Sequence, residues 1–137
     1  MSEDSKKIKV FSSAVGRRKS SIVVARLIPG SGKVVINGQP AEKYFNFNPA
    51  ALAKLASPFA IAAVTKYDVM VTARGGGNVG QLDAVVLAIS RCLVKIKEDH
   101  RSPLRQQGML TRDSRIRQRR QVGTGGKSRR RKQSPKR

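Results

Sequence analysis

The chain of 137 residues carries 29 Lys or Arg against 8 Asp or Glu, a formal net charge of +21, with one Cys and one His. This length predicts one domain with an appendage, and the lone Cys and His exclude a disulfide framework and a Cys/His zinc site. A charge excess of this size favours binding to nucleic acid, where counterions are released and the self-repulsion of the protein is neutralised.

Neither a secretory signal nor a membrane span is expected. The first residues lack a run of apolar side chains, and the most apolar window, Ala50–Val64, is shorter than a span and contains Lys54. The sequence therefore predicts a soluble protein of a reducing compartment.

Three short strands are predicted in the N-terminal part of the chain. Lys7–Ser12 alternates weakly, Ser21–Ile28 is apolar on both faces as in a central strand, and Lys33–Ile36 ends at Asn37-Gly38. Gly16–Ser20, with three consecutive cations, is interpreted as a loop between the first two strands. The pattern predicts a meander of these three strands.

A short helix over Pro40–Phe45 and a longer one beginning at Asn48-Pro49 follow, because Asn suits a helix N-cap and Pro the first helical position. Pro58 is expected to break or kink the longer helix. Lys66–Arg74 then alternates, with Tyr67, Val69, Val71 and Ala73 on one face, which predicts a fourth strand.

The most strongly predicted helix follows Gly75–Gly77. Leu82, Val85, Val86, Ile89, Leu93 and Ile96 recur at spacings of three and four. One more helical turn is expected within Ser102–Gln107. The element order predicts an α+β fold, a two-layer sandwich of a mainly antiparallel four-stranded sheet with helices on one face.

The last 26 residues, 112–137, form a basic arm. They carry twelve Lys or Arg against Asp113, and their only aliphatic side chains are Ile116 and Val122. Such a segment buries too little apolar surface to offset the entropy of ordering. We predict a globular domain at residues 1–111 and an arm at 112–137 that is disordered unless bound to RNA.

Two glycine motifs imitate nucleotide-binding loops. Gly75-x-Gly77-x-x-Gly80 lies between a strand and a helix, as the dinucleotide fingerprint does, but it follows the fourth strand and no second βαβ unit comes after it. Gly126-Lys127-Ser128 imitates the end of a phosphate-binding loop, but Gln121 occupies the position of the required first glycine. Neither motif supports nucleotide binding, and no cofactor is predicted.

No catalytic constellation emerges from the sequence. Cys92 lies beside the apolar helix stripe and is interpreted as a core residue, and His100 lies at a helix C-terminus, where a cation is favourable. Asp68 and Asp83 are a possible carboxylate pair, interpreted as exposed solubilising acids. We predict neither an enzyme nor a metal site.

The many Lys and Arg residues instead indicate binding to RNA. A side-chain-free loop beside Arg74 allows the backbone to approach a phosphate, and the few aromatic residues sit at core-like positions, so contacts with phosphates and RNA shape are favoured over base stacking. The candidate RNA-binding residues are Arg17, Arg18, Lys19, Ser20, Arg74, Gly75, Gly76, Gly77, Arg112, Arg115, Arg117, Arg119, Arg120, Lys127, Arg129, Arg130 and Arg131.

Together these stretches resemble the family of the ninth protein of the small ribosomal subunit, in its bacterial or organellar form. The resemblance runs in the family's order through Gly16-Arg17-Arg18-Lys19-Ser20, Val24-Ala25-Arg26-Leu27, Pro29-Gly30-Ser31-Gly32-Lys33, Ile36-Asn37-Gly38, Lys66-Tyr67-Asp68-Val69, Arg74-Gly75-Gly76-Gly77, Gly80-Gln81, Gly108-Met109-Leu110-Thr111-Arg112-Asp113 and the final Lys136-Arg137.

The resemblance implies a fold like the second domain of the fifth small-subunit ribosomal protein. It implies a place in the head of the small subunit, on its ribosomal RNA and beside other head proteins, in a bacterial cytoplasmic ribosome or an organellar one. It also implies that Lys136 and Arg137 contact the transfer RNA in the peptidyl (P) site. The family usually has an aromatic residue and then serine before this pair, whereas Ser134-Pro135 stand here.

Two alternatives from other classes remain. A protein subunit of an RNA-processing ribonucleoprotein shares this type of fold and is also basic, and a DNA-compacting protein would also be basic. A disordered basic arm at the C-terminal end favours the ribosomal interpretation, and no dimerising apolar helix supports DNA compaction.

Overall fold

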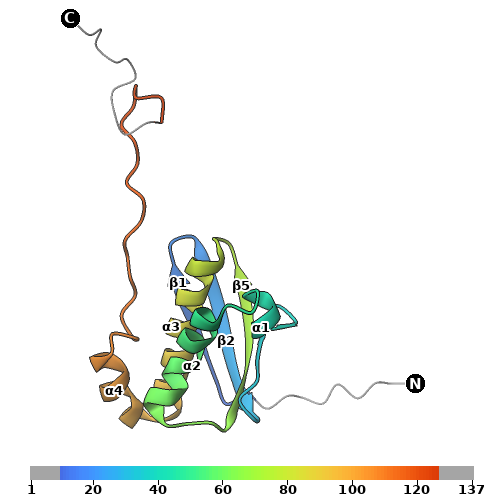
Figure 1. Cartoon of the computed structure of the whole chain (residues 1–137). Helices are drawn as coiled ribbons and strands as arrows, with labels where there is room; N and C mark the ends of the chain where they lie inside the picture. The colour runs from blue at the N-terminus through green and yellow to red at the C-terminus, as the bar shows by residue number, and fades with distance from the viewer. Residues whose placement is uncertain (1–9, 127–137) are drawn as a thin grey trace, which may run out of the picture.

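The computed structural model describes residues 10–126, which form a five-stranded sheet with helices on one face (Figure 1). The strands lie in the order β1 (Ser12–Arg18), β2 (Ser21–Pro29), β5 (Tyr67–Arg74), β3 (Val34–Ile36) and β4 (Gln39–Pro40). The β1–β2, β2–β5 and β3–β4 pairs are antiparallel, whereas β3 runs parallel to β5. The predicted α+β class is confirmed.

Two details of the predicted sheet are wrong. The sheet has a fifth strand, β4, which follows the Asn37-Gly38 turn and pairs with β3. The first three strands do not form a meander, because β5 inserts between β2 and β3. Pairing between segments so far apart in the chain depends on how their buried faces fit together, and the alternation within each strand does not encode it.

The first strand also lies later than predicted. Val10 and Phe11 precede it, and the strand continues through Gly16, Arg17 and Arg18 to a turn at Lys19 and Ser20. Its inward residues, Ser12, Ala14 and Gly16, are small, so the alternation carries no aliphatic signal. They are small because helix α3 packs directly on this strand: a Cβ on Gly16 would lie 1.9 Å from the carbonyl oxygen of Ala84.

The helices are α1 (Ala41–Tyr44), α2 (Pro49–Ala62), α3 (Asn78–Ile96), a short 3₁₀ helix η1 (Glu98–His100) and α4 (Arg101–Gln106). The predicted start of α2 is confirmed, since the Asn48 side chain accepts a hydrogen bond from the amide of Ala50. The break predicted at Pro58 does not occur. The Lys54 carbonyl, which has no amide donor at position 58, accepts the Ser57 hydroxyl at 2.6 Å instead.

Helix α3 is the centre of the core. Its predicted apolar stripe is buried except for Ile96, which is half-buried, and Cys92 is fully buried beside it, as predicted. The stripe packs on β1 and β2, where Val23, Ala25 and Leu27 have no exposed surface. Leu104 is likewise fully buried and anchors α4 beside α2.

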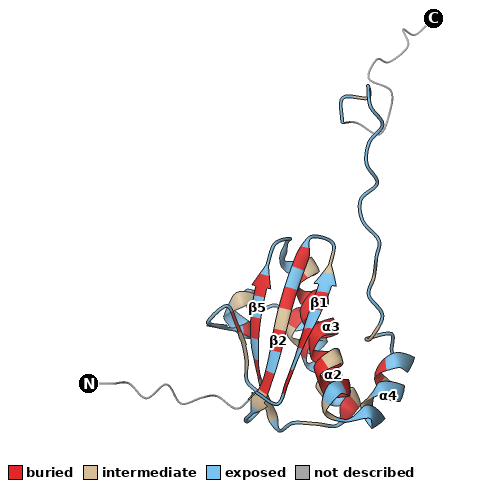
Figure 2. Ribbon diagram, turned by 180° about the vertical axis from the view of Figure 1, so that it is seen from behind, coloured by how far each residue is buried: buried red, intermediate tan, exposed pale blue. Residues whose placement is uncertain are grey.

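The other face of the sheet is not covered by any helix of the described chain (Figure 2). Val15, Ile22 and Met70 on this face are 39–49 % exposed. The apolar character of β2 on both faces therefore reflects its central place in the sheet and not burial from two sides. Within residues 10–126, no helix has the length and apolar character needed to span a membrane.

Candidate nucleic-acid interface

The two predicted RNA-binding loops lie against each other at one end of the sheet. A Cβ on Gly75 would be 2.7 Å from the carbonyl oxygen of Ser20, and Gly75 has φ +71°, so glycine is required there for both space and conformation. Lys19, Ser20, Gly76 and Gly77 line a hollow of about 310 Å³ with the first turn of α3. The fold thus brings together residues predicted separately from two motifs.

Arg17 and Arg74 lie on the uncovered face, on two strands that β2 separates. Strand register aligns both with Ile22, which stands between them across β1, β2 and β5. Arg26, four residues along β2 from Ile22, faces the same way and is exposed. Sequence reasoning missed Arg26, although its alternation with the inward residues Ala25 and Leu27 would have placed it on the same face as Arg17 once the buried face of β2 was known.

Arg18 faces the opposite way, because successive strand residues point to opposite sides of a sheet. Its side chain is only 13 % exposed. Its guanidinium lies 3.7 Å from an oxygen of Asp83 on α3 and 3.2 Å from an oxygen of Asp113 in the arm, and it donates to the carbonyl of Arg115. These contacts, which we call the Arg18 clamp, fasten the beginning of the arm to the domain.

Asp113 is also held by Arg115. Arg115 donates its Nε and Nη2 groups to the two carboxylate oxygens at 2.8–3.2 Å, and its backbone amide donates at 3.0 Å. These hydrogen bonds, together with the positive charges of Arg115 and Arg18, hold the pKa of Asp113 well below its usual range. The Asp113 carboxylate therefore stays charged at any physiological pH and keeps the clamp closed.

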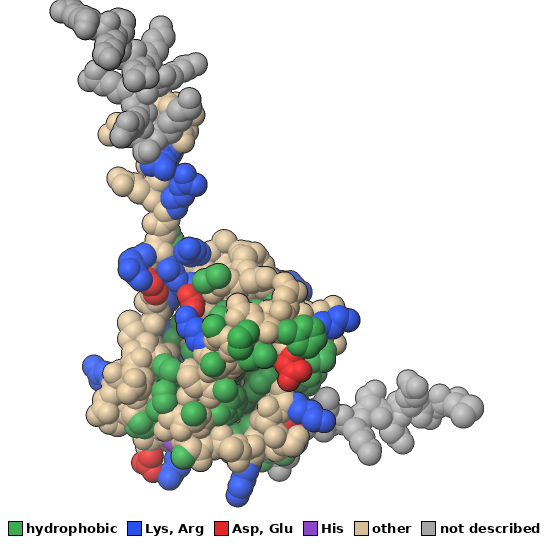
Figure 3. All heavy atoms as spheres, viewed as in Figure 1, with side chains coloured by type: hydrophobic (Ala, Val, Ile, Leu, Met, Phe, Trp, Pro, Cys, Tyr) green, Lys and Arg blue, Asp and Glu red, His purple; other side chains and the backbone are tan. Residues whose placement is uncertain are grey.

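The remaining arm residues present cations without regular structure. Arg112, Arg117, Arg119 and Arg120 are exposed in a segment with no helix or strand, which leaves the domain beside α4 (Figure 1). Figure 3 shows Lys and Arg side chains gathered where the arm leaves the domain, with acidic side chains among them. Lys127, Arg129, Arg130, Arg131, Lys136 and Arg137 lie outside the described residues.

The interpretation of Asp68 and Asp83 as merely solubilising acids is wrong. Asp83 bridges Arg18 and Lys54, whose ammonium lies 2.6 Å away. One oxygen of Asp68 accepts the backbone amides of Ser31, Gly32 and Lys33 at 2.8–2.9 Å. Both carboxylates organise the fold, and no local pattern in the sequence indicates this because their partners lie 29–65 positions away.

The buried thiol of Cys92 is not a reactive nucleophile. The thiol has no exposed surface and lies 3.5 Å from the carbonyl of Ala25. Burial away from water raises its pKa to about 11, so the reactive thiolate is not formed at neutral pH. In residues 10–126, no group of three or more His, Cys, Asp or Glu is placed to hold a metal ion.

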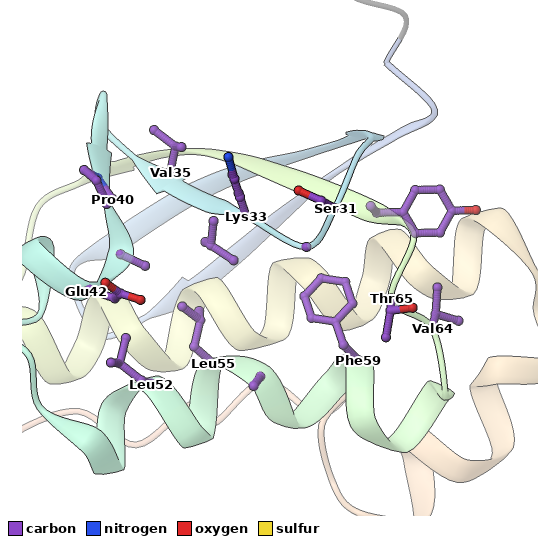
Figure 4. Close-up of a pocket in the computed structure, with 15 residues that line it drawn as sticks. Ser31, Lys33, Val35, Pro40, Glu42, Leu52, Leu55, Phe59, Val64 and Thr65 are labelled. Atoms are coloured by element: carbon purple, nitrogen blue, oxygen red, sulfur yellow. The ribbon is translucent and has the colours of Figure 1, made fainter.

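An apolar hollow of about 570 Å³ lies between β3 and α2 (Figure 4). Leu52, Leu55 and Phe59 point into it from α2, and Lys33 and Glu42 are the charged residues of its lining. This lining offers no pairing of a nucleophile with a base and no cluster of cations. The mainly apolar lining of this hollow therefore differs in chemistry from the basic surfaces.

Comparison with known proteins connects these surfaces to one family. Residues 16–137 match the family model described as Ribosomal protein S9/S16. The small ribosomal subunit protein uS9 of Acaryochloris marina is 47% identical over 109 residues, covering 79% of this chain and 80% of that protein. The small ribosomal subunit protein uS9c of Pyropia yezoensis is 41% identical over 124 residues, covering 90% of each.

Proposed function

Since the chain belongs to the ribosomal protein S9/S16 family, we propose that it is a structural constituent of the small ribosomal subunit and binds its ribosomal RNA. The relatives are bacterial uS9 proteins and the uS9c proteins of Gracilaria tenuistipitata and Pyropia yezoensis, which supports a ribosome in a bacterium or an organelle. The family is one of structural ribosomal proteins and not of enzymes. The alternative, an RNA-processing ribonucleoprotein, has no support among these relatives.

The single observation that carries this function is the family match over residues 16–137, because it includes both the domain and the arm. The geometry supports it. The β1–β2 turn and the Gly75–Gly77 loop are adjacent, and Arg17 and Arg74 flank Ile22 on the open sheet face. This end of the domain presents cations and closely approachable backbone, which suit RNA phosphates.

We further propose that the arm reaches the transfer RNA of the P site through Lys136 and Arg137, in the head of the subunit. This proposal rests on the family resemblance and on the twelve cations of residues 112–137. The Arg18 clamp supports it, because an arm whose first residues are held to the domain starts from a defined point.

The test is reconstitution of small subunits that lack this protein. Full chain and a variant without Lys136 and Arg137 should assemble equally. Subunits with the shortened chain should retain P-site transfer RNA about tenfold less well, because a hydrogen bond to a charged group contributes about 1.5–3 kcal/mol.

A matched control is the double variant Lys43→Ala/Lys66→Ala, which also removes two positive charges, at exposed positions of the domain. It should retain transfer RNA as the unchanged chain does. Equal retention by the shortened chain would rule out the terminal contact, and failure of the full chain to join the subunit would rule out the structural function itself.

A further inference from the structure

A second concentration of cations lies away from the predicted RNA-binding loops. A groove of about 590 Å³ is formed by β1, the C-terminal half of α3, α4 and the residue before Thr111. Its floor is apolar, and four of its eight lining residues are basic, with no carboxylate among them. The lining residues are Ala14, Val15, Arg91, Val94, Lys95, Arg101, Arg105 and Leu110.

The two cations of α3 are fixed in place by the edge of the sheet. Arg91 donates to the carbonyl of Val15 at 2.8 Å, and Lys95 donates to the carbonyl of Ser13 at 2.7 Å. They stand four residues apart, on the same face of the helix. Each bond uses one donor, whereas a guanidinium has five and an ammonium three, so both can bind an anion without leaving β1.

The two cations of α4 stand opposite them. Arg101 and Arg105 are also four residues apart and exposed. The Nε of Arg101 lies 2.8 Å from Glu98, but that pair is more than half exposed on both sides. An exposed ion pair is weak, so Glu98 does not prevent Arg101 from meeting a stronger anion. The groove therefore has two basic side chains on each side.

We propose that this groove binds a further stretch of ribosomal RNA backbone, separate from the contacts of the β1–β2 turn and the Gly75–Gly77 loop. The proposal rests on the proposed function for the class of partner. Phosphates fit the two pairs of cations, and the apolar lining residues Ala14, Val94 and Leu110 suit the C–H faces of the sugars between them. Two residues beyond Leu110, Arg112 continues the basic surface into the arm.

The first test compares two double variants of equal charge. Arg101→Glu/Arg105→Glu changes the groove, whereas Lys43→Glu/Lys66→Glu changes exposed cations outside it; each lowers the net charge by four, from +21 to +17. Binding is measured against protein-free small-subunit ribosomal RNA over a series of potassium chloride concentrations. Thermal unfolding of both variants checks that the fold is kept.

The groove variant should bind at least tenfold more weakly than the control variant. The slope of log affinity against log salt concentration should fall by about 1.4–1.8 relative to that control, because each lost phosphate contact removes about 0.7–0.9. Equal affinities and slopes for the two variants would overturn the proposal. So would a groove variant that keeps RNA affinity and instead loses a neighbouring subunit protein.

The second test locates the RNA directly. Because Cys92 is buried, a thiol reagent can place an iron–EDTA cleavage probe at an introduced cysteine alone. Gln106→Cys puts the probe next to Arg105, and Ser20→Cys puts it at the β1–β2 turn. Both should cleave the ribosomal RNA, at different nucleotides. Cleavage only from position 20 would overturn the groove proposal, and cleavage from neither would contradict the proposed function.

Discussion

Asp68 shows how one side chain determines a whole turn. Its carboxylate gathers three consecutive amides at Ser31, Gly32 and Lys33, so the Pro29–Lys33 segment is closed against β5. Gly30 packs on the same carboxylate, where a Cβ would come within 2.1 Å of an oxygen. The hydrogen bond from Lys33 is the largest of the effects that lower the pKa of Asp68.

This geometry predicts a pH-dependent stability. Because the pKa of Asp68 is lowered in the folded chain, its contribution is complete above the ordinary value of 3.8 and is lost as pH falls through the lowered value. Asp68→Asn should lower the unfolding temperature at pH 7, and the gap to the unchanged protein should close in acid.

Thermal unfolding from pH 7 to pH 3 measures this gap. Asp68→Ala, which removes the acceptor itself, should remain less stable throughout that range. A gap for Asp68→Asn that is constant with pH would show that the charge of Asp68 does not stabilise the turn.

At the scale of elements, helix α3 packs tightly on β1. Ser12, Ala14 and Gly16 allow the helix to approach the strand, and the Cys92 thiol reaches the carbonyl of Ala25 in the neighbouring strand. This approach carries Arg91 and Lys95 to the β1 edge, where they donate to its free carbonyls. An edge strand covered in this way is protected from pairing with another chain.

Gly16→Ala should therefore destabilise the domain by about 1–3 kcal/mol, the range for an overpacked core, because the new methyl group would meet the Ala84 carbonyl. Gly77→Ala is the matched control, since a Cβ there meets nothing within 4 Å, and its cost should stay below about 1 kcal/mol. Urea unfolding measures both, and equal midpoints for the two variants would contradict this packing.

At the scale of the whole molecule, the Arg18 clamp connects the domain and the arm. Asp113 and Arg115, which contact it, lie beyond the boundary predicted at residue 111. The disorder of the free arm stays a prediction, but its first residues have defined partners in the domain. The clamp uses one of the cations predicted for RNA, so Arg18 acts on the arm within the protein.

Spin labels at the exposed positions Val79 and Ile116 can test the clamp. Arg18→Ala should broaden the distance distribution between them, because the arm would lose its fastening. The exchange Arg18→Asp/Asp113→Arg should restore part of the narrow distribution, because it returns an opposite-charge pair between these two positions. The recovery should be partial, because the new carboxylate at position 18 would face the carboxylate of Asp83. Arg17→Ala, on the other face of β1, is the matched control and should leave the distribution unchanged.

Local chemistry in the sequence was sufficient for much of the fold. The spacing of Leu82 to Ile96 required a buried helix, Asn48-Pro49 required a helix start, and the alternation through Val69 and Val71 required a half-buried strand, because each pattern follows from the geometry of its own element. The charge of residues 112–137 by itself predicts a polyanion partner for the arm, and this stays a prediction.

Only the tertiary structure decided which distant residues meet. It placed β5 between β2 and β3, and gave Arg18 partners 65 and 95 positions away. It also gathered the groove cations of α3 and α4 around β1. These arrangements depend on packing between elements, where small side chains such as Gly16 and Ala14 permit contact without leaving a hydrophobic signal in the sequence.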